Sequence, residues 1–150
     1  MKMVYFNELK KQIEDSRLEG EDFETSITYL PDMFSLLCDM LDENILTQED
    51  RMLVNSAIAY LVVPSDVLPE DVYGARGFMD DLFVCCVVFK ELMKRYPDLL
   101  RKHWANTVDT EEFDKVLDLC YFRSNQAMDE ENIKQEVLEY AGLAPPEGTN

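Results

Sequence analysis

A group of carboxylates near the middle of the chain has the residue types and spacing to bind a cation. Its members are Asp66, Glu70, Asp71, Asp80 and Asp81. Carboxylate oxygens are the ligands that hard divalent ions such as Mg²⁺ or Ca²⁺ prefer, although this spacing is not that of an EF-hand loop. Gathered carboxylates repel one another unless a cation or a basic side chain such as Arg76 lies between them. The pattern therefore predicts a candidate metal site at Asp66, Asp80 and Asp81.

A structural role explains the same carboxylates without an ion. Asp66 follows Pro64, where its side chain can accept hydrogen bonds from the backbone amides of a turn. Asp80 and Asp81 fall in the first turn of an expected helix, where the helix dipole favours negative charge. Aspartates at helix ends are common, so we favour this structural interpretation and keep the metal site as the alternative.

Nucleophilic catalysis has one conceivable pair of residues, Cys85 with His103, since His103 is the single histidine. A lone histidine next to Trp104 is more often a packing or surface residue. The segment Gly74-Ala75-Arg76-Gly77 is too short for a phosphate-binding loop and lacks its lysine, and neither Gly-x-Ser-x-Gly nor His-Glu-x-x-His occurs. We therefore assign no catalytic residue and no cofactor, and expect a non-enzymatic protein.

Two apolar segments position the central carboxylates. The first, residues 57–63, ends at Pro64, because proline lacks an amide donor and disfavours a helical residue before it. Pro69 and Gly77 punctuate the connection before the second segment begins. The first helix should start at Thr47, a hydroxyl residue followed three positions later by an acid. This order predicts a helix, a loop with acidic groups at its bend, and a second helix.

The residues of this unit carry a family resemblance. They are Pro64, Asp66 and Pro69 in the pattern Pro-x-Asp-x-Leu-Pro, followed by Gly77 and the pair Asp80-Asp81, with Ala59-Tyr60-Leu61-Val62 before them. In this order they resemble the YkvA-like family of small helical domains, which has no assigned function. The resemblance implies an all-helical fold with a YkvA-like core at about residues 52–96. It supplies no catalytic residue.

Periodic apolar positions predict helices along the rest of the chain. The segments expected to be helical are 1–18, 31–41, 47–63, 78–96, 97–104, 110–120 and 129–140, the first with an apolar stripe at Val4, Leu9, Ile13 and Leu18. Strand-like alternation and internal repeats are absent from the sequence. The expected fold is all-α, a compact bundle of about six or seven helices. One domain should span residues 1–143, ended by Gly142, with a flexible C-terminal tail at 144–150.

The charge balance limits the function. Fourteen basic and 31 acidic residues give a net charge of −17. Direct nucleic-acid binding is not expected, because no basic stripe is present to displace counterions from phosphates. Solubility alone would also explain the acidic charge. We predict a non-enzymatic protein–protein interaction module with an unidentified partner, a basic protein being one candidate. The alternative is a divalent-metal-dependent hydrolase that uses the central acidic cluster.

We expect the protein to be cytoplasmic and its cysteines to be reduced. No apolar stretch reaches the roughly 20 residues of a membrane span, and the first residues lack the unbroken apolar core of a signal peptide. The four cysteines, Cys38, Cys85, Cys86 and Cys120, lie in apolar helical patterns without a Cys-x-x-Cys pair. We expect reduced, buried thiols.

A third hypothesis concerns an apolar surface on the second central helix. If Phe83, Val87 and Phe89 were exposed, they would form a patch that needs cover. A lipid surface, a membrane protein or a second copy in a homodimer would each provide that cover, and the sequence does not choose among them.

Overall fold

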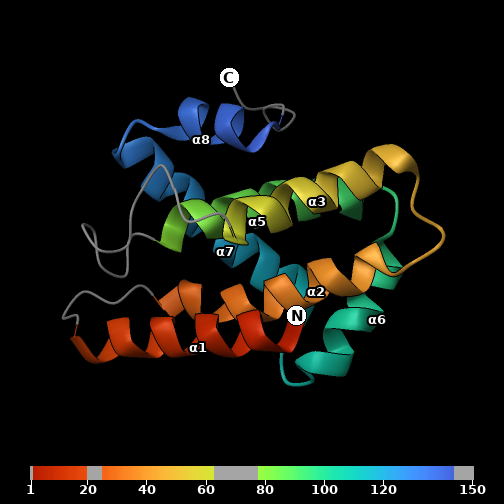
Figure 1. Ribbon diagram of the computed structural model, residues 1–150, viewed down its shortest axis with the longest axis horizontal. Helices are drawn as coiled ribbons and strands as arrows, with labels where there is room; N and C mark the ends of the chain where they lie inside the picture. Colours follow the sequence, from red (N-terminus) through yellow and green to blue (C-terminus); the bar gives the residue numbers. More distant parts are fainter. Residues whose placement is uncertain (1, 20–24, 63–77, 144–150) are drawn as a thin grey trace.

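Seven α-helices and one 3₁₀-helix make up the described part of the computed structural model, residues 2–19, 25–62 and 78–143 (Figure 1). They are α1 (Lys2–Glu19), η1 (Thr25–Tyr29), α2 (Leu30–Leu41), α3 (Gln48–Val62), α5 (Met79–Met93), α6 (Pro97–Thr107), α7 (Phe113–Glu130) and α8 (Lys134–Ala141). These residues contain no strand. The prediction of an all-α bundle of six or seven helices is confirmed.

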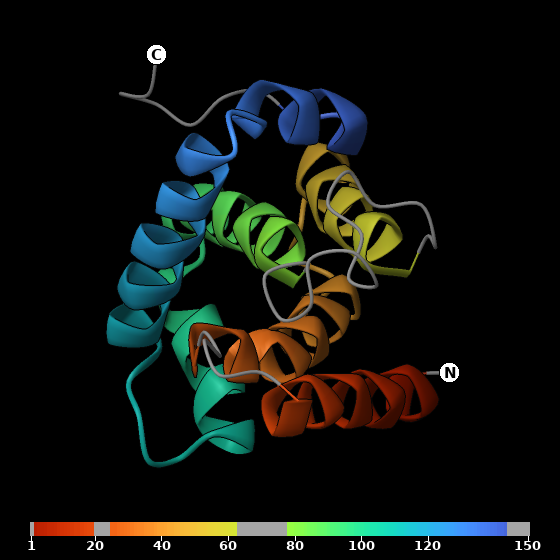
Figure 2. The ribbon, with the colours of Figure 1, turned by 90° about the vertical axis from the view of Figure 1, so that its left-hand side faces the viewer.

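Helix α5 lies at the centre of the bundle. Every residue from Met79 to Phe89 is buried, as expected of a helix that is apolar on all sides. Helix α7 packs along it most extensively, and α3 covers another side. Figure 2 shows α5 in green, with α7 in teal and blue on one side and α3 in yellow on the other. No helix within the described ranges is long and apolar enough to cross a membrane.

The hypothesis that α5 carries an exposed apolar patch is wrong. Phe83 and Phe89 are completely buried, and Val87 is 7% exposed. The ring of Phe83 stacks on Tyr121 of α7 at 6.1 Å between centroids, and Phe89 meets Phe113 edge-on at 5.5 Å. Because α7 supplies the cover, these side chains need no lipid, membrane protein or second copy.

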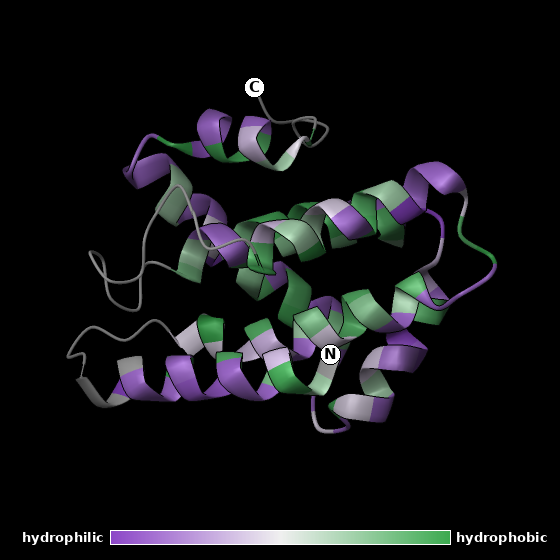
Figure 3. Cartoon of the chain, in the orientation of Figure 1, coloured by the Kyte–Doolittle hydropathy of each residue, from purple (hydrophilic) through white to green (hydrophobic). Residues whose placement is uncertain are grey.

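The apolar stripe predicted for α1 is correct in its middle and wrong at Val4. Leu9 and Ile13 are buried, whereas Val4 is 71% exposed; the side chain of Leu18 lies outside the described residues. The neighbouring Tyr5 packs against the core instead. Its ring lies 4.6 Å from that of Phe34, and its hydroxyl donates to the carbonyl of Leu61 at 2.5 Å. The rest of α1 is mainly hydrophilic, as Figure 3 shows.

Local signals place several helix starts correctly. Pro31 lies in the first turn of α2, where the missing amide costs no hydrogen bond. Thr47 Oγ1 accepts a hydrogen bond from the amide of Asp50 at 3.1 Å and so caps α3. Pro97 begins α6. The prediction of a helix start at Thr110 is wrong, because α7 begins at Phe113.

The segment predicted as one last helix, residues 129–140, belongs to two helices. Helix α7 continues through Glu130, and α8 begins only at Lys134, so the single predicted helix over 129–140 is wrong at its start. Between them Asn132 adopts a positive φ of 57°, a conformation that asparagine tolerates better than most residues. Gly142, with φ 74°, ends α8 as predicted.

Candidate functional site

The structure describes only the helical side of the predicted acidic bend. Pro64, Asp66, Pro69 and Gly77 lie outside the described residues, as do Glu70, Asp71 and Arg76. Asp80 and Asp81 occupy the first turn of α5, as the sequence predicts.

Asp80 bonds α5 to α3, and its partner Tyr60 contacts α8. Its carboxylate is completely buried, and its Oδ2 accepts a hydrogen bond from the hydroxyl of Tyr60 on α3 at 2.7 Å. The ring of Tyr60 meets that of Tyr140 on α8 edge-on, with centroids 5.8 Å apart. A buried carboxylate needs hydrogen-bond donors and a favourable field to remain charged, and the start of α5 supplies such a field. This geometry supports a role for Asp80 in joining helices.

Asp81 lies one turn before Cys85 and is 3% exposed. Burial raises the pKa of the Cys85 thiol, and the negative charge of Asp81 and the neighbouring Cys120 raise it further. Cys85 is therefore a protonated, inaccessible thiol, the opposite of an activated nucleophile. His103, the candidate general base, contacts Glu43: its Nε2 lies 2.7 Å from Oε1 of that residue. These contacts do not support a Cys85–His103 catalytic pair.

The predicted metal site stays a prediction. Among the described residues no group of three or more His, Cys, Asp or Glu side chains is arranged to hold a metal ion. Asp66, the third proposed ligand, lies in the part of the chain outside the description. The four thiols form no disulfide. Cys85, Cys86 and Cys120 are buried as predicted, and Cys38 is partly exposed.

Asp50 makes a tertiary contact that sequence analysis missed. Its carboxylate is 3% exposed and accepts hydrogen bonds from Arg95 Nε at 3.1 Å, from Arg95 Nη2 at 2.5 Å and from the Tyr96 hydroxyl at 2.6 Å. Burial alone would raise the pKa of Asp50, but the hydrogen bonds from Arg95, Tyr96 and Thr47 outweigh it and hold that pKa below its usual value. The contact joins the start of α3 to the corner between α5 and α6.

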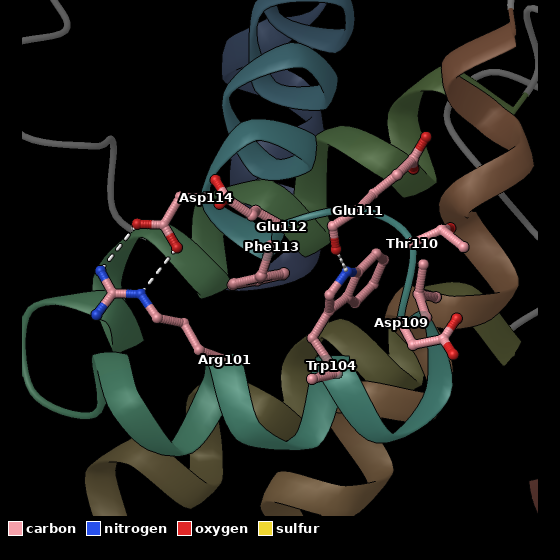
Figure 4. Close-up of a pocket in the computed structure, with 10 residues that line it drawn as sticks. Arg101, Trp104, Asp109, Thr110, Glu111, Glu112, Phe113 and Asp114 are labelled. Atoms are coloured by element: carbon pink, nitrogen blue, oxygen red, sulfur yellow. Dashed lines mark hydrogen bonds and ion pairs between the residues drawn. The ribbon is translucent and has the colours of Figure 1, made fainter.

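A groove of about 500 Å³ opens between α6 and the start of α7 (Figure 4). Helix α6, the connecting segment and the first turn of α7 line it between residues 101 and 114. Its apolar lining includes Trp104 and Phe113, whose ring centroids lie 5.3 Å apart. Nothing in the sequence pattern had indicated this groove, because its walls come from two helices whose approach is a tertiary property.

Two aromatic side chains hold the connecting segment in place. The indole of Trp104 donates to the carbonyl of Glu111 at 3.1 Å, which keeps this stretch outside α7 and explains the late helix start. A hydrogen bond between Tyr29 and Glu111, with burial as a second cause, raises the pKa of Tyr29 to about 12. The groove therefore has a fixed wall.

The charges of the groove are unevenly distributed. At one end Arg101 donates to both carboxylate oxygens of Asp114, at 2.9 and 2.8 Å, and lowers the pKa of that group. The other acidic lining residues are Asp109, Glu111 and Glu112. Figure 4 shows Arg101 and Asp114 together at one end, and Asp109 and Glu111 on the connecting segment at the other. One end is thus locally compensated and the other is acidic.

A family model without an assigned function matches one segment of the chain. The family described as "Protein of unknown function (DUF1232)" matches residues 50–86. That segment contains α3 and the first half of α5, and therefore Asp50, Tyr60, Asp80 and Asp81.

Two relatives extend this result. The chain is 32% identical over 129 residues to the uncharacterized protein ORF9 of Methanothermobacter thermautotrophicus, covering 85% of this chain and 84% of that protein. It is 42% identical over 52 residues to the E3 ubiquitin-protein ligase RNF170 of Danio rerio, covering 35% of this chain but 20% of that protein. No solved structure matches the chain. The protein is an all-helical member of the family that includes ORF9.

Proposed function

We propose that the protein is a non-enzymatic interaction module that binds a basic segment of another protein. The observation that carries this proposal is the preformed groove between α6 and α7, which combines an apolar floor with an acidic end. Preformed concave sites with a few placed polar groups are the usual form of binding sites. The net charge of −17 favours encounter with a basic partner.

Existing ion pairs leave the acidic excess of the chain unchanged. Many basic side chains already lie within 4 Å of a carboxylate, so fewer basic side chains remain to pair with the excess carboxylates. The paired basic residues are Arg17, Lys90, Lys94, Arg95, Arg101, Lys115 and Lys134. The carboxylates left over make a basic partner more favourable than an acidic one.

In this proposal the segment matched by the family model, residues 50–86, stabilises the fold and does not bind the partner. The YkvA-like resemblance, predicted for about residues 52–96, overlaps the matched segment 50–86, and we propose that the whole α3–α5 unit is its counterpart. The Tyr60–Asp80 and Asp50–Arg95 contacts support this role. We also propose a single domain over residues 1–143 and a cytoplasmic location. The ligase activity named for RNF170 is not extended to this chain, which covers a fifth of that protein.

The alternative, a divalent-metal hydrolase at Asp66, Asp80 and Asp81, has weaker support. Asp80 is completely buried and accepts from Tyr60, which favours a structural role. Calorimetric titration with Mg²⁺, Ca²⁺ and Mn²⁺ tests the alternative. Heat of binding that disappears in the Asp81→Asn variant, together with a higher melting temperature in the presence of the ion, would replace our proposal with the metal site.

A peptide selection tests the proposed function. The protein is immobilised and used to select from a displayed library of random twelve-residue peptides. We expect the selected peptides to share basic residues beside apolar ones, and to bind more tightly than scrambled peptides of the same composition. Equal binding of selected and scrambled peptides would show charge attraction without recognition, and would refute the proposal.

A further inference from the structure

The groove between α6 and α7 has two unlike ends, and this difference allows its ligand to be specified. We propose that it docks an extended peptide in which a lysine or arginine faces Asp109 and an adjacent apolar side chain lies toward the Arg101–Asp114 pair. The inference rests on the proposed function and names its site and the chemistry of its partner.

The compensated end of the groove disfavours a basic side chain. The Arg101 guanidinium binds both oxygens of Asp114 and also lies 3.2 Å from Asp98. A bidentate arginine–carboxylate pair uses the strongest acceptor directions of that carboxylate. A second cation would be repelled by Arg101. This end is better suited to an apolar side chain, which would pack beside the aliphatic part of Arg101.

The opposite end suits a cation. Asp109 is exposed and makes no ion pair with any described residue, and Glu111 follows two positions later on the same connecting segment. Val108, half-buried and also part of the lining, offers an apolar surface next to these carboxylates. Lysine and arginine place a long aliphatic stem on apolar surface while their charged group stays near carboxylates and water. Val108 offers the apolar surface for the stem, and Asp109 and Glu111 offer the carboxylates for the charged group.

The connecting segment that lines the groove is held by a hydrogen bond from α6. Trp104 is 1% exposed, and its indole donates to the carbonyl of Glu111 at 3.1 Å. Preorganisation lowers the entropy cost of binding. Its volume of about 500 Å³ falls within the usual range for binding pockets, so a few adjacent side chains would fill it.

Trp104 provides a local readout, because it is the single tryptophan of the chain. The probe is a fluorescein-labelled peptide of the sequence Gly-Lys-Leu-Arg-Val-Lys-Leu-Gly, which contains no aromatic residue, and an unlabelled copy serves for tryptophan emission. We expect saturable binding at low salt, together with a shift of Trp104 emission that saturates at the same peptide concentration. Binding without any change in Trp104 emission would place the peptide elsewhere and overturn the inference.

A pair of charge-matched variants separates the groove from the overall charge. The double variant Asp109→Asn with Glu111→Gln removes the two carboxylates of the acidic end of the groove. The control, Glu8→Gln with Asp15→Asn, removes two exposed carboxylates from α1, so both proteins have the same net charge. We expect the groove variant to bind the probe about fivefold or more weakly, and the control to bind it within twofold of the wild type.

The outcomes distinguish this inference from the proposed function. Equal weakening in both variants, or no weakening in the groove variant, would overturn the groove as the docking site even if the wild type selects specific peptides. Circular dichroism spectra and melting temperatures of both variants check that they remain folded. The removed side chains are exposed, so both should stay within about 2 °C of the wild type.

Discussion

The Asp50→Asn variant is the strongest test of how this fold is held together. The substitution keeps the shape of the side chain but removes its negative charge. In the wild type that charge accepts two hydrogen bonds from Arg95 and one from Tyr96 while being 3% exposed. Removing one partner of a buried ion pair costs about 3–5 kcal/mol. Because the Arg95 side chain is 38% exposed, solvent screens part of that loss, and we expect about 2 kcal/mol.

Urea denaturation followed by circular dichroism measures this difference. For a protein of this size about 2 kcal/mol corresponds to a fall in melting temperature of roughly 4–8 °C. The control is Asp118→Asn, the same chemical change in an exposed pair, where Lys90 Nζ lies 3.1 Å from the carboxylate. Such pairs contribute about 0–1 kcal/mol. If Asp50→Asn costs no more than Asp118→Asn, the proposed coupling of α3 to the α5–α6 corner is refuted.

The pH dependence of the same variant gives a second check. The pKa of Asp50 is lower in the folded protein than the value of about 3.9 expected for the unfolded chain. A depressed carboxyl pKa stabilises the fold above the unfolded value, and that contribution is lost as the pH falls through the folded value. The stability difference between wild type and Asp50→Asn should therefore be constant near neutral pH and shrink below about pH 4. A difference that does not change with pH would contradict this explanation.

Three further outcomes follow from single contacts. Tyr60→Phe should lower the free energy of unfolding by about 1–2 kcal/mol because it removes a donor to the buried Asp80; the matched Tyr140→Phe control, at an exposed side chain, should have little effect in the same denaturation assay. Gly142→Ala should lower the free energy of unfolding by about 1 kcal/mol, because alanine disfavours the φ of 74° at this position. Crowding adds nothing, since no atom lies within 4 Å of an added Cβ. A stabilised variant would contradict this. With a thiol reagent such as dithionitrobenzoate, the native protein should react only at Cys38, and the buried cysteines only after denaturation; rapid native labelling of Cys85 would show that the core opens.

Local sequence signals predicted the helices wherever the deciding interaction lies within a few residues. Pro31 and Pro97 mark helix starts because proline lacks an amide donor, and Thr47 marks another because its hydroxyl accepts from an amide three residues later. Gly142 marks an end because its positive φ suits glycine. The start of α7 was missed because Trp104 and Tyr29, distant from one another in sequence, hold Glu111 outside the helix.

At the candidate sites too, the sequence predicted local positions but not the tertiary contacts. The sequence located Asp80 and Asp81 in a first helical turn, but it did not show that Tyr60 donates to Asp80. It used Asp50 only as the acid three positions after Thr47, whereas the carboxylate binds Arg95, 45 residues away. The groove between α6 and α7 left no local signal, because its acidic residues resemble any solvated charged segment.

By itself, the sequence determined the helical class, the positions of most helix ends and the acidic balance, because periodicity, caps and charge depend on residue type and short spacing. The tertiary structure alone decided which apolar face α7 covers, where the carboxylate of Asp50 finds its partner and where a groove opens. The first two depend on the packing of segments far apart in the chain, and the groove depends on how two helices that are neighbours in sequence approach each other. Several pairings of helices would satisfy the same local pattern.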